Sequence, residues 1–61
     1  MSSLPQIRTQ VVRLERYCRR TKDRIRAGTH DDLFQAMVDV AEAGEISRRL
    51  YISLQQHLNL E

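Results

Sequence analysis

The sequence has little of what most folds and most active sites require. Its 61 residues include one cysteine, one proline, two glycines and no tryptophan, and aromatic residues make up only 5%. A lone cysteine cannot form an intramolecular disulfide, and this composition suits a sheet poorly. No apolar run approaches the ~18 residues of a membrane span, and Met1–Leu14 lacks the apolar core of a signal peptide. We therefore expect one small helical domain, in the cytoplasm and without membrane contact.

Apolar residues recur at helical spacing in both halves of the chain. In the first half, steps of three and four residues give the series Leu4, Ile7, Val11, Leu14, Cys18, Thr21, Ile25. In the second half, the same steps give Leu33, Met37, Val40, Gly44, Ser47, Tyr51, Leu54, Leu58. The two stripes predict two helices that pack against each other through them. We expect Gly44 to lie opposite Leu14, where a close approach would explain the glycine.

Local signals predict where each helix begins and ends. Ser3 and Gln6 have the spacing of a capping box, and Gly28 followed by Thr29 has the pattern of one helix end and the next N-cap. We predict a helix at about 4–27, a turn at 28–29 and a helix at about 30–58. So short a turn makes the helices antiparallel neighbours. The predicted fold class is all-α, an antiparallel two-helix hairpin.

The second helix carries more apolar surface than the first helix can cover. Beside its stripe lie further apolar residues, whereas the flanks of the first stripe are mostly charged. A hairpin of this size also barely offsets the entropy of ordering its chain. We therefore expect association, either with a second copy as a four-helix bundle or with a larger helical protein. The predicted partner-binding residues are Phe34, Ala36, Ala43, Ile46, Leu50, Ile52 and Leu58.

Charge divides the chain into a basic half and an acidic half. The segment 8–26 holds eight basic and two acidic residues, whereas six acidic and two basic residues follow Gly28. The basic half suggests an alternative function, because arginine's planar side chain suits phosphate recognition. In that alternative the chain is an RNA-binding regulatory dimer, and its candidate contacts are Arg13, Arg16, Arg19, Arg20 and Arg26.

Residues that could carry chemistry do not form a recognisable set. His30 and His57 would lie about 40 Å apart along the second helix at 1.5 Å per residue, so one metal ion cannot bind both within a hairpin. Cys18 lies on the first stripe, where a buried structural thiol is expected. No catalytic triad pattern, glycine-rich phosphate loop or metal-ligand spacing is present in the sequence. We expect no enzyme, no cofactor, no metal and no small-molecule substrate.

The chain resembles the helical-hairpin co-chaperones of bacterial type III secretion needle subunits. The resemblance spans about Val11 to Leu58 and includes Cys18-Arg19-Arg20, the Gly28 turn, the pair Phe34-Gln35, and the alanine-rich middle of the second helix. It implies a hairpin that docks on a helical-repeat chaperone through the exposed flank of its second helix. The pair of proteins would then hold an aggregation-prone needle subunit.

The length, the hairpin and the basic first helix are also similar to those of Rop-like plasmid regulators. That resemblance implies a homodimeric four-helix bundle that binds paired RNA stem-loops through basic helix faces. Both resemblances are of shape, which does not by itself fix function.

Overall fold

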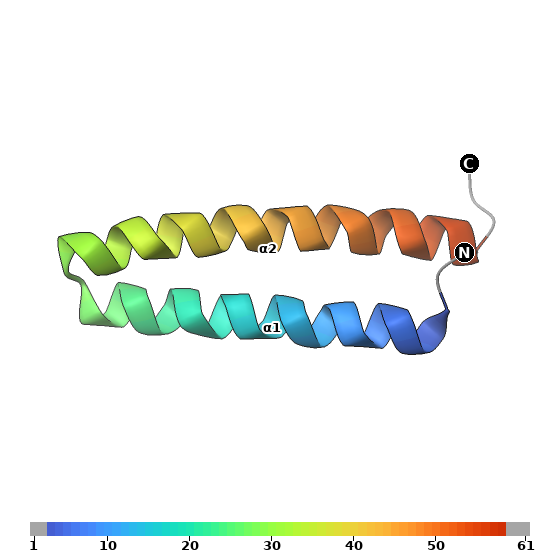
Figure 1. Cartoon of the computed structure of the whole chain (residues 1–61), viewed down its shortest axis with the longest axis horizontal. Helices are drawn as coiled ribbons and strands as arrows, with labels where there is room; N and C mark the ends of the chain where they lie inside the picture. The colour runs from blue at the N-terminus through green and yellow to red at the C-terminus, as the bar shows by residue number, and fades with distance from the viewer. Residues whose placement is uncertain (1–2, 59–61) are drawn as a thin grey trace.

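The computed structural model describes residues 3–58 as two long antiparallel helices (Figure 1). Helix α1 spans Leu4–Ala27 and helix α2 spans His30–His57, joined by Gly28 and Thr29. The helices lie side by side along their whole length (Figure 1). The prediction of an all-α two-helix hairpin is confirmed. The observed bounds differ from the predicted ones by one residue, at the end of α2.

The first helix begins at the predicted capping box. The Gln6 backbone N–H donates to Ser3 Oγ (3.4 Å), and the Ser3 N–H donates to Gln6 Oε1 (3.2 Å). Pro5 follows in the first turn, where its missing N–H has no intrahelical partner to lose. These contacts satisfy two backbone donors that would otherwise be unpaired, which fixes the start of α1.

The turn is built from the two residues that the sequence marks. Gly28 takes the left-handed conformation (φ 74°), and its N–H donates to Arg24 O (3.0 Å), which ends α1. Thr29 then starts α2, since its Oγ1 accepts from the Asp32 N–H (3.1 Å). Asp31 and Asp32 lie in the first turn, where negative charge is favoured by the helix dipole.

Most of the residues that pack between the two helices lie one position before the residues predicted to do so. We call the seam the set of buried and half-buried residues that face the other helix. On α1 they are Ile7, Gln10, Leu14, Tyr17, Thr21 and Arg24, and on α2 they are Asp32, Ala36, Asp39, Ala43, Ile46, Leu50 and Ser53. They too are spaced by alternating steps of three and four residues.

The predicted packing of the two stripes is therefore wrong in part. Ile7, Leu14 and Thr21 face α2 as expected, but Val11, Cys18 and Ile25 are exposed, and so is every member of the stripe predicted on α2. The physical reason is that α2 carries two adjacent stripes with the same spacing, and a single helix can cover only one. The covered stripe is the one that includes Asp39, which pairs with Arg24 on α1.

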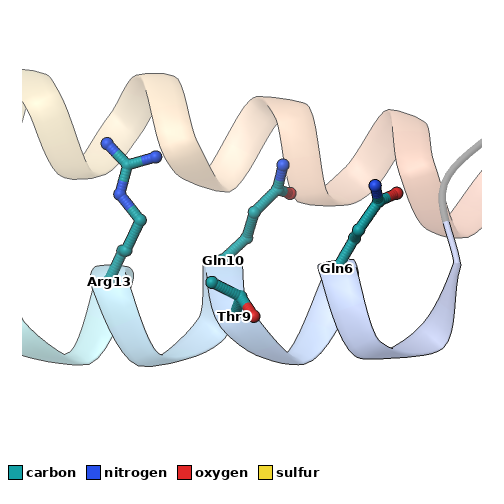
Figure 2. Close-up of a pocket in the computed structure, with 4 residues that line it drawn as sticks. All are labelled: Gln6, Thr9, Gln10 and Arg13. Carbon is teal, nitrogen blue, oxygen red and sulfur yellow. The ribbon is translucent and has the colours of Figure 1, made fainter.

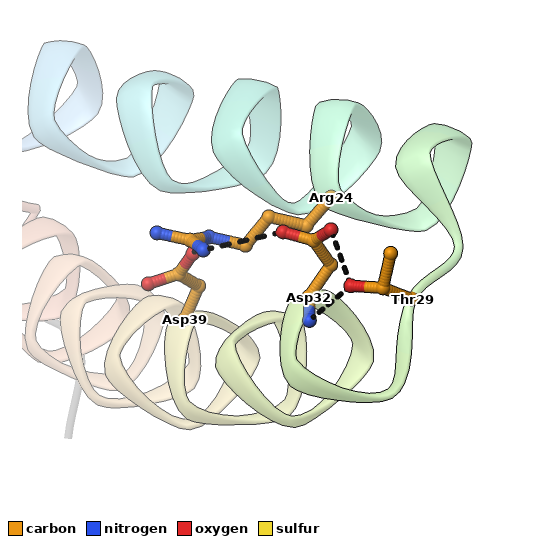
Figure 3. A network of polar contacts seen from close by, with 4 residues as sticks. All are labelled: Arg24, Thr29, Asp32 and Asp39. Carbon is orange, nitrogen blue, oxygen red and sulfur yellow. Dashed lines mark hydrogen bonds and ion pairs between the residues drawn. The ribbon is translucent and has the colours of Figure 1, made fainter.

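The two halves of the seam are held differently. The half nearer the chain ends holds the apolar cluster of Ile7, Ile46 and Leu50, with Leu14 and Tyr17 packed against it. The half nearer the turn is polar (Figure 3). There Arg24 Nε lies 3.0 Å from Asp39 Oδ2, and Arg24 Nη1 lies 3.9 Å from Asp32 Oδ1. Thr29 Oγ1 also donates to Asp32 Oδ2 (2.6 Å), which ties the turn to this network.

The hairpin is a single layer of helices. Its principal extents are 44 × 20 × 12 Å, and the shortest is about the diameter of one helix. No large side chain of the described residues is fully buried. Most domains enclose a core between two layers. This hairpin instead exposes two broad faces, one on each side of the seam.

Candidate interaction surfaces

One broad face of the hairpin is apolar. Because antiparallel helices are related by a two-fold axis perpendicular to their common plane, residues that directly follow seam residues lie on the same side of the pair. Val11 follows Gln10 in this way, and Val40 follows Asp39. We call this side the apolar face, formed by Leu4, Val11, Cys18 and Ile25 of α1 and by Leu33, Met37, Val40, Tyr51, Leu54 and Leu58 of α2. Three charged residues of α1, Arg8, Glu15 and Lys22, also directly follow seam residues and lie on this side.

The side chains of the apolar face are well exposed. Their exposed fractions run from 40% at Val11 to 64% at Tyr51. Covering a large apolar side chain contributes about 1.5–3 kcal/mol, so a partner on this face would gain substantial free energy. Soluble monomers rarely expose contiguous apolar patches of more than a few hundred Å². The face therefore has the character of an interaction surface.

Gly44 lies in the middle of the apolar face, next to Ser47. A Cβ atom placed on Gly44 would have no non-neighbouring atom within 4 Å, so the expected close approach of Leu14 is absent. Leu14 faces the seam instead. A glycine inside a helix costs about 1 kcal/mol relative to alanine. Among residues 3–58, no close contact at Gly44 offsets that cost.

The structure divides the seven predicted partner-binding residues. Ala36, Ile46 and Leu50 are buried in the seam and Ala43 is half-buried there, so α1 already covers them. The other three, Phe34, Ile52 and Leu58, are exposed.

Of these three, only Leu58 lies on the apolar face; Phe34 and Ile52 lie on other sides of α2. The spacing of Met37, Val40, Tyr51 and Leu54 had assigned them to the contact with α1, so they were not among the predicted partner-binding residues.

The five arginines predicted as candidate RNA contacts lie elsewhere. Arg13, Arg16 and Arg20 each directly precede a seam residue, which places them on the face opposite the apolar face. Arg19 and Arg26 point away from α2 by their position on the helix. All five are exposed, and Arg20 Cζ lies 5.2 Å from the ring centroid of Tyr17. Among the described residues none of the five forms an ion pair. The basic surface formed by Arg13, Arg16 and Arg20 thus lies opposite the apolar face, whereas Arg8 and Lys22 lie on the apolar side.

A shallow hollow lies on α1, beside the basic surface. It is lined by Gln6, Thr9, Gln10 and Arg13, all from α1 (Figure 2). These four side chains include no carboxylate, and no nucleophile next to a base. Its one notable feature is Gln10, whose Oε1 atom is buried without a hydrogen-bond partner.

Replacing Gln10 by leucine should stabilise the hairpin. A buried acceptor without a partner costs about 1–3 kcal/mol, and leucine at this seam position would pack between Ile7 and Leu14 instead. We expect the Gln10→Leu variant to gain about 1–2 kcal/mol in urea unfolding, against less than about 0.5 kcal/mol for Gln35→Leu on the exposed surface. A loss of stability in Gln10→Leu would show that the amide has a partner in solution.

The remaining candidates for chemistry do not come together. His30 and His57 are exposed at opposite ends of α2. Cys18 is exposed on the apolar face, which corrects the expectation of a buried thiol. Within residues 3–58, no group of three or more histidine, cysteine, aspartate or glutamate side chains could hold a metal ion. No helix in the described part of the chain is long and apolar enough to cross a membrane.

Comparison with known proteins matches the chain to no family model, no curated protein and no solved structure. The two faces of the hairpin are therefore the features that bear on its function.

Proposed function

We propose that this chain is a non-catalytic protein–protein interaction module. Its apolar face packs against helices of a second copy or of another helical protein and completes a bundle with them. The observation that carries the proposal is the exposure of ten apolar or thiol side chains on one side of a single helical layer. Such a layer buries little apolar surface by itself, and a second layer supplies the missing half of the core.

A more specific form of this proposal is a secretion co-chaperone. It is supported by the resemblance between the segment 11–58 and the hairpin co-chaperones of needle subunits. It is also supported by an apolar face of the kind that docks on a helical-repeat protein. In this form the partner is a larger helical chaperone, and the hairpin contributes the two helices that cover its groove.

The proposal is tested by whether the chain sediments as part of a larger complex in an extract of its native cells. A fluorescently labelled chain, added together with excess unlabelled chain so that a second copy is also present, should sediment faster than a free 7.2 kDa hairpin. The variant Met37→Asp/Leu54→Asp should sediment as the free hairpin, because two charges on the apolar face oppose its burial. Removing one large apolar side chain from the interface costs about 1.5–3 kcal/mol, so binding of the double variant should weaken by at least about a hundredfold.

A matched control places the same charges on the other side of α2. Val38 and Ile52 are exposed apolar residues that directly precede seam residues. The Val38→Asp/Ile52→Asp variant should therefore sediment like the wild type. Equal behaviour of the two double variants, or a wild-type chain that sediments as a free hairpin, would contradict the proposal.

The second candidate is binding of RNA through the basic surface of α1. It is favoured by the exposure of Arg13, Arg16 and Arg20 on one side of the hairpin, without ion pairs to the described residues. The same sedimentation experiment separates it from the first candidate. Association through arginine and phosphate would disappear with nuclease or added salt and would survive aspartate on the apolar face. Association through the apolar face would show the opposite responses.

A further inference from the structure

We infer that the occupant of the apolar face is a second copy of this chain, packed face to face about a two-fold axis to form a four-helix bundle. This inference rests on the proposed function and names its partner. It draws on the surface area of the hairpin, on the distribution of large and small residues along α2, and on the charges beside the apolar residues of α1.

The exposed area matches one half of a dimer. The chain exposes 5082 Å², whereas a compact monomer of 7.2 kDa exposes roughly 4,100 Å² by the scaling of surface with mass. The excess is therefore about 1,000 Å². A standard interface buries about 800 Å² from each partner. Covering the apolar face by one further hairpin would thus bring the exposed area per chain to that of an ordinary compact protein.

The part of the apolar face that α2 contributes is complementary to itself. Gly44 and Ser47 occupy its middle, and large side chains flank them on both sides. If two α2 helices lie antiparallel across the two-fold axis, Gly44 meets Ser47 of the second copy, and Val40 meets Tyr51 of the second copy. The same register pairs Met37 with Leu54 and Leu33 with Leu58. Small residues at the axis allow the helix backbones to approach closely, and this explains a glycine that the hairpin leaves without a contact.

The first helix fits the same arrangement. In the hairpin, the α1 residues level with the middle of the α2 stripe are Val11 and Val12, which lie as many residues before the turn as the middle of the stripe lies after it. An axis at this level brings Arg8 opposite Glu15 of the second copy, and Glu15 opposite Arg8 of the second copy. Both residues are exposed and neither forms an ion pair with the described residues of its own chain. The contact between the two α2 helices is then apolar, and the contact between the two α1 helices pairs opposite charges among its apolar residues.

The experiment is sedimentation equilibrium on the purified chain, with Gly44→Met as the test variant. The wild type should have twice the 7.2 kDa chain mass and dissociate on dilution. Methionine favours helix and has open space at this position in the hairpin, so the variant should be at least as helical as the wild type. Overpacking at the axis should nevertheless weaken the dimer by about tenfold or more.

The control is Gln35→Met, an equally large side chain on the opposite face of α2, which should leave the dimer unchanged. A dimer that is equally strong in the wild type and Gly44→Met would overturn the packing of α2 on α2. A wild-type chain that stays a folded monomer would overturn the inference as a whole. In that second case, loss of association of the Met37→Asp/Leu54→Asp variant in extract would still support the proposed function with a different partner.

Discussion

Replacing Leu50 by aspartate should abolish the helical hairpin itself, not only its association. The Leu50 side chain is 8% exposed and packs with Ile7 and Ile46 in the apolar cluster of the seam. Truncating a buried leucine to alanine costs about 2–5 kcal/mol, and aspartate adds the cost of burying a charge. A chain of 61 residues has little stability to lose. We therefore expect the helical signal in far-ultraviolet circular dichroism to collapse.

The same replacement one turn further along should have a different result. Leu54 is 44% exposed on the apolar face, so aspartate there remains solvated. The Leu54→Asp variant should keep the helical signal of the wild type at low concentration and lose association. The two variants make the same chemical change on the same helix. They differ in that Leu50 lies in the seam and Leu54 lies on the apolar face. Equal loss of helix in both would contradict the assignment of Leu50 to the seam and Leu54 to the apolar face.

The second large effect concerns the ion pair near the turn. The Asp39 side chain is 8% exposed, and its partner Arg24 is 34% exposed. Removing Arg24 leaves a covered carboxylate without its cation. Breaking a fully buried pair in this way costs about 3–5 kcal/mol, and the partial exposure of Arg24 reduces this to about 1–3 kcal/mol. We expect the Arg24→Leu variant to lose this amount of unfolding free energy in a urea titration.

The double variant Arg24→Leu/Asp39→Leu should recover most of that loss. Apolar side chains of similar volume often replace a buried ion pair without loss of stability, because neither charge then has to be desolvated. The control is Arg26→Leu, which removes an exposed arginine of the same turn of α1 and should change stability by less than about 0.5 kcal/mol. If Arg24→Leu and Arg26→Leu were equally stable, the ion pair would not hold the turn end of the hairpin.

The helices and their ends could be predicted because their signals are local. Ser3 with Gln6, and Gly28 with Thr29, act within a few residues of themselves, and the structure shows each pair in the predicted cap. The antiparallel arrangement followed from the length of the turn alone. These features do not depend on which residues of one helix face the other.

The facing of the helices could not be predicted in the same way. The spacing of apolar residues on α2 fits two adjacent stripes equally well, one through Ala36, Ile46 and Leu50 and the other through Met37, Val40 and Leu54. The stripe that α1 covers contains Asp39, the partner of Arg24; these two residues are 15 apart in sequence and become neighbours only after the hairpin closes. The spacing of apolar residues contains no information about a polar pair of this kind.

This exchange of stripes also explains the outcome for the candidate site. The excess of apolar surface on α2 was recognised from the sequence, and the structure exposes such a surface. Its members changed, because the α2 residues assigned to the hairpin contact are exposed, whereas four of the seven residues assigned to the partner lie in the seam. Leu58 belongs to the exposed apolar surface in both descriptions. The hypothesis that α2 exposes apolar surface to a partner therefore keeps the same physical basis. Several residues of that surface lie one position after the residues first assigned to it.

The reactivity of the Cys18 thiol reports whether a second copy covers the apolar face. Cys18 is exposed on that face in the single hairpin, and it is the only cysteine of the chain. Its rate of reaction with an aromatic disulfide reagent is measured across a dilution series of the unmodified protein. We predict that the rate falls with rising concentration in proportion to the remaining fraction of monomer. A rate that stays fast at every concentration, in a chain that circular dichroism shows to be fully helical, would mean that no second copy covers the apolar face.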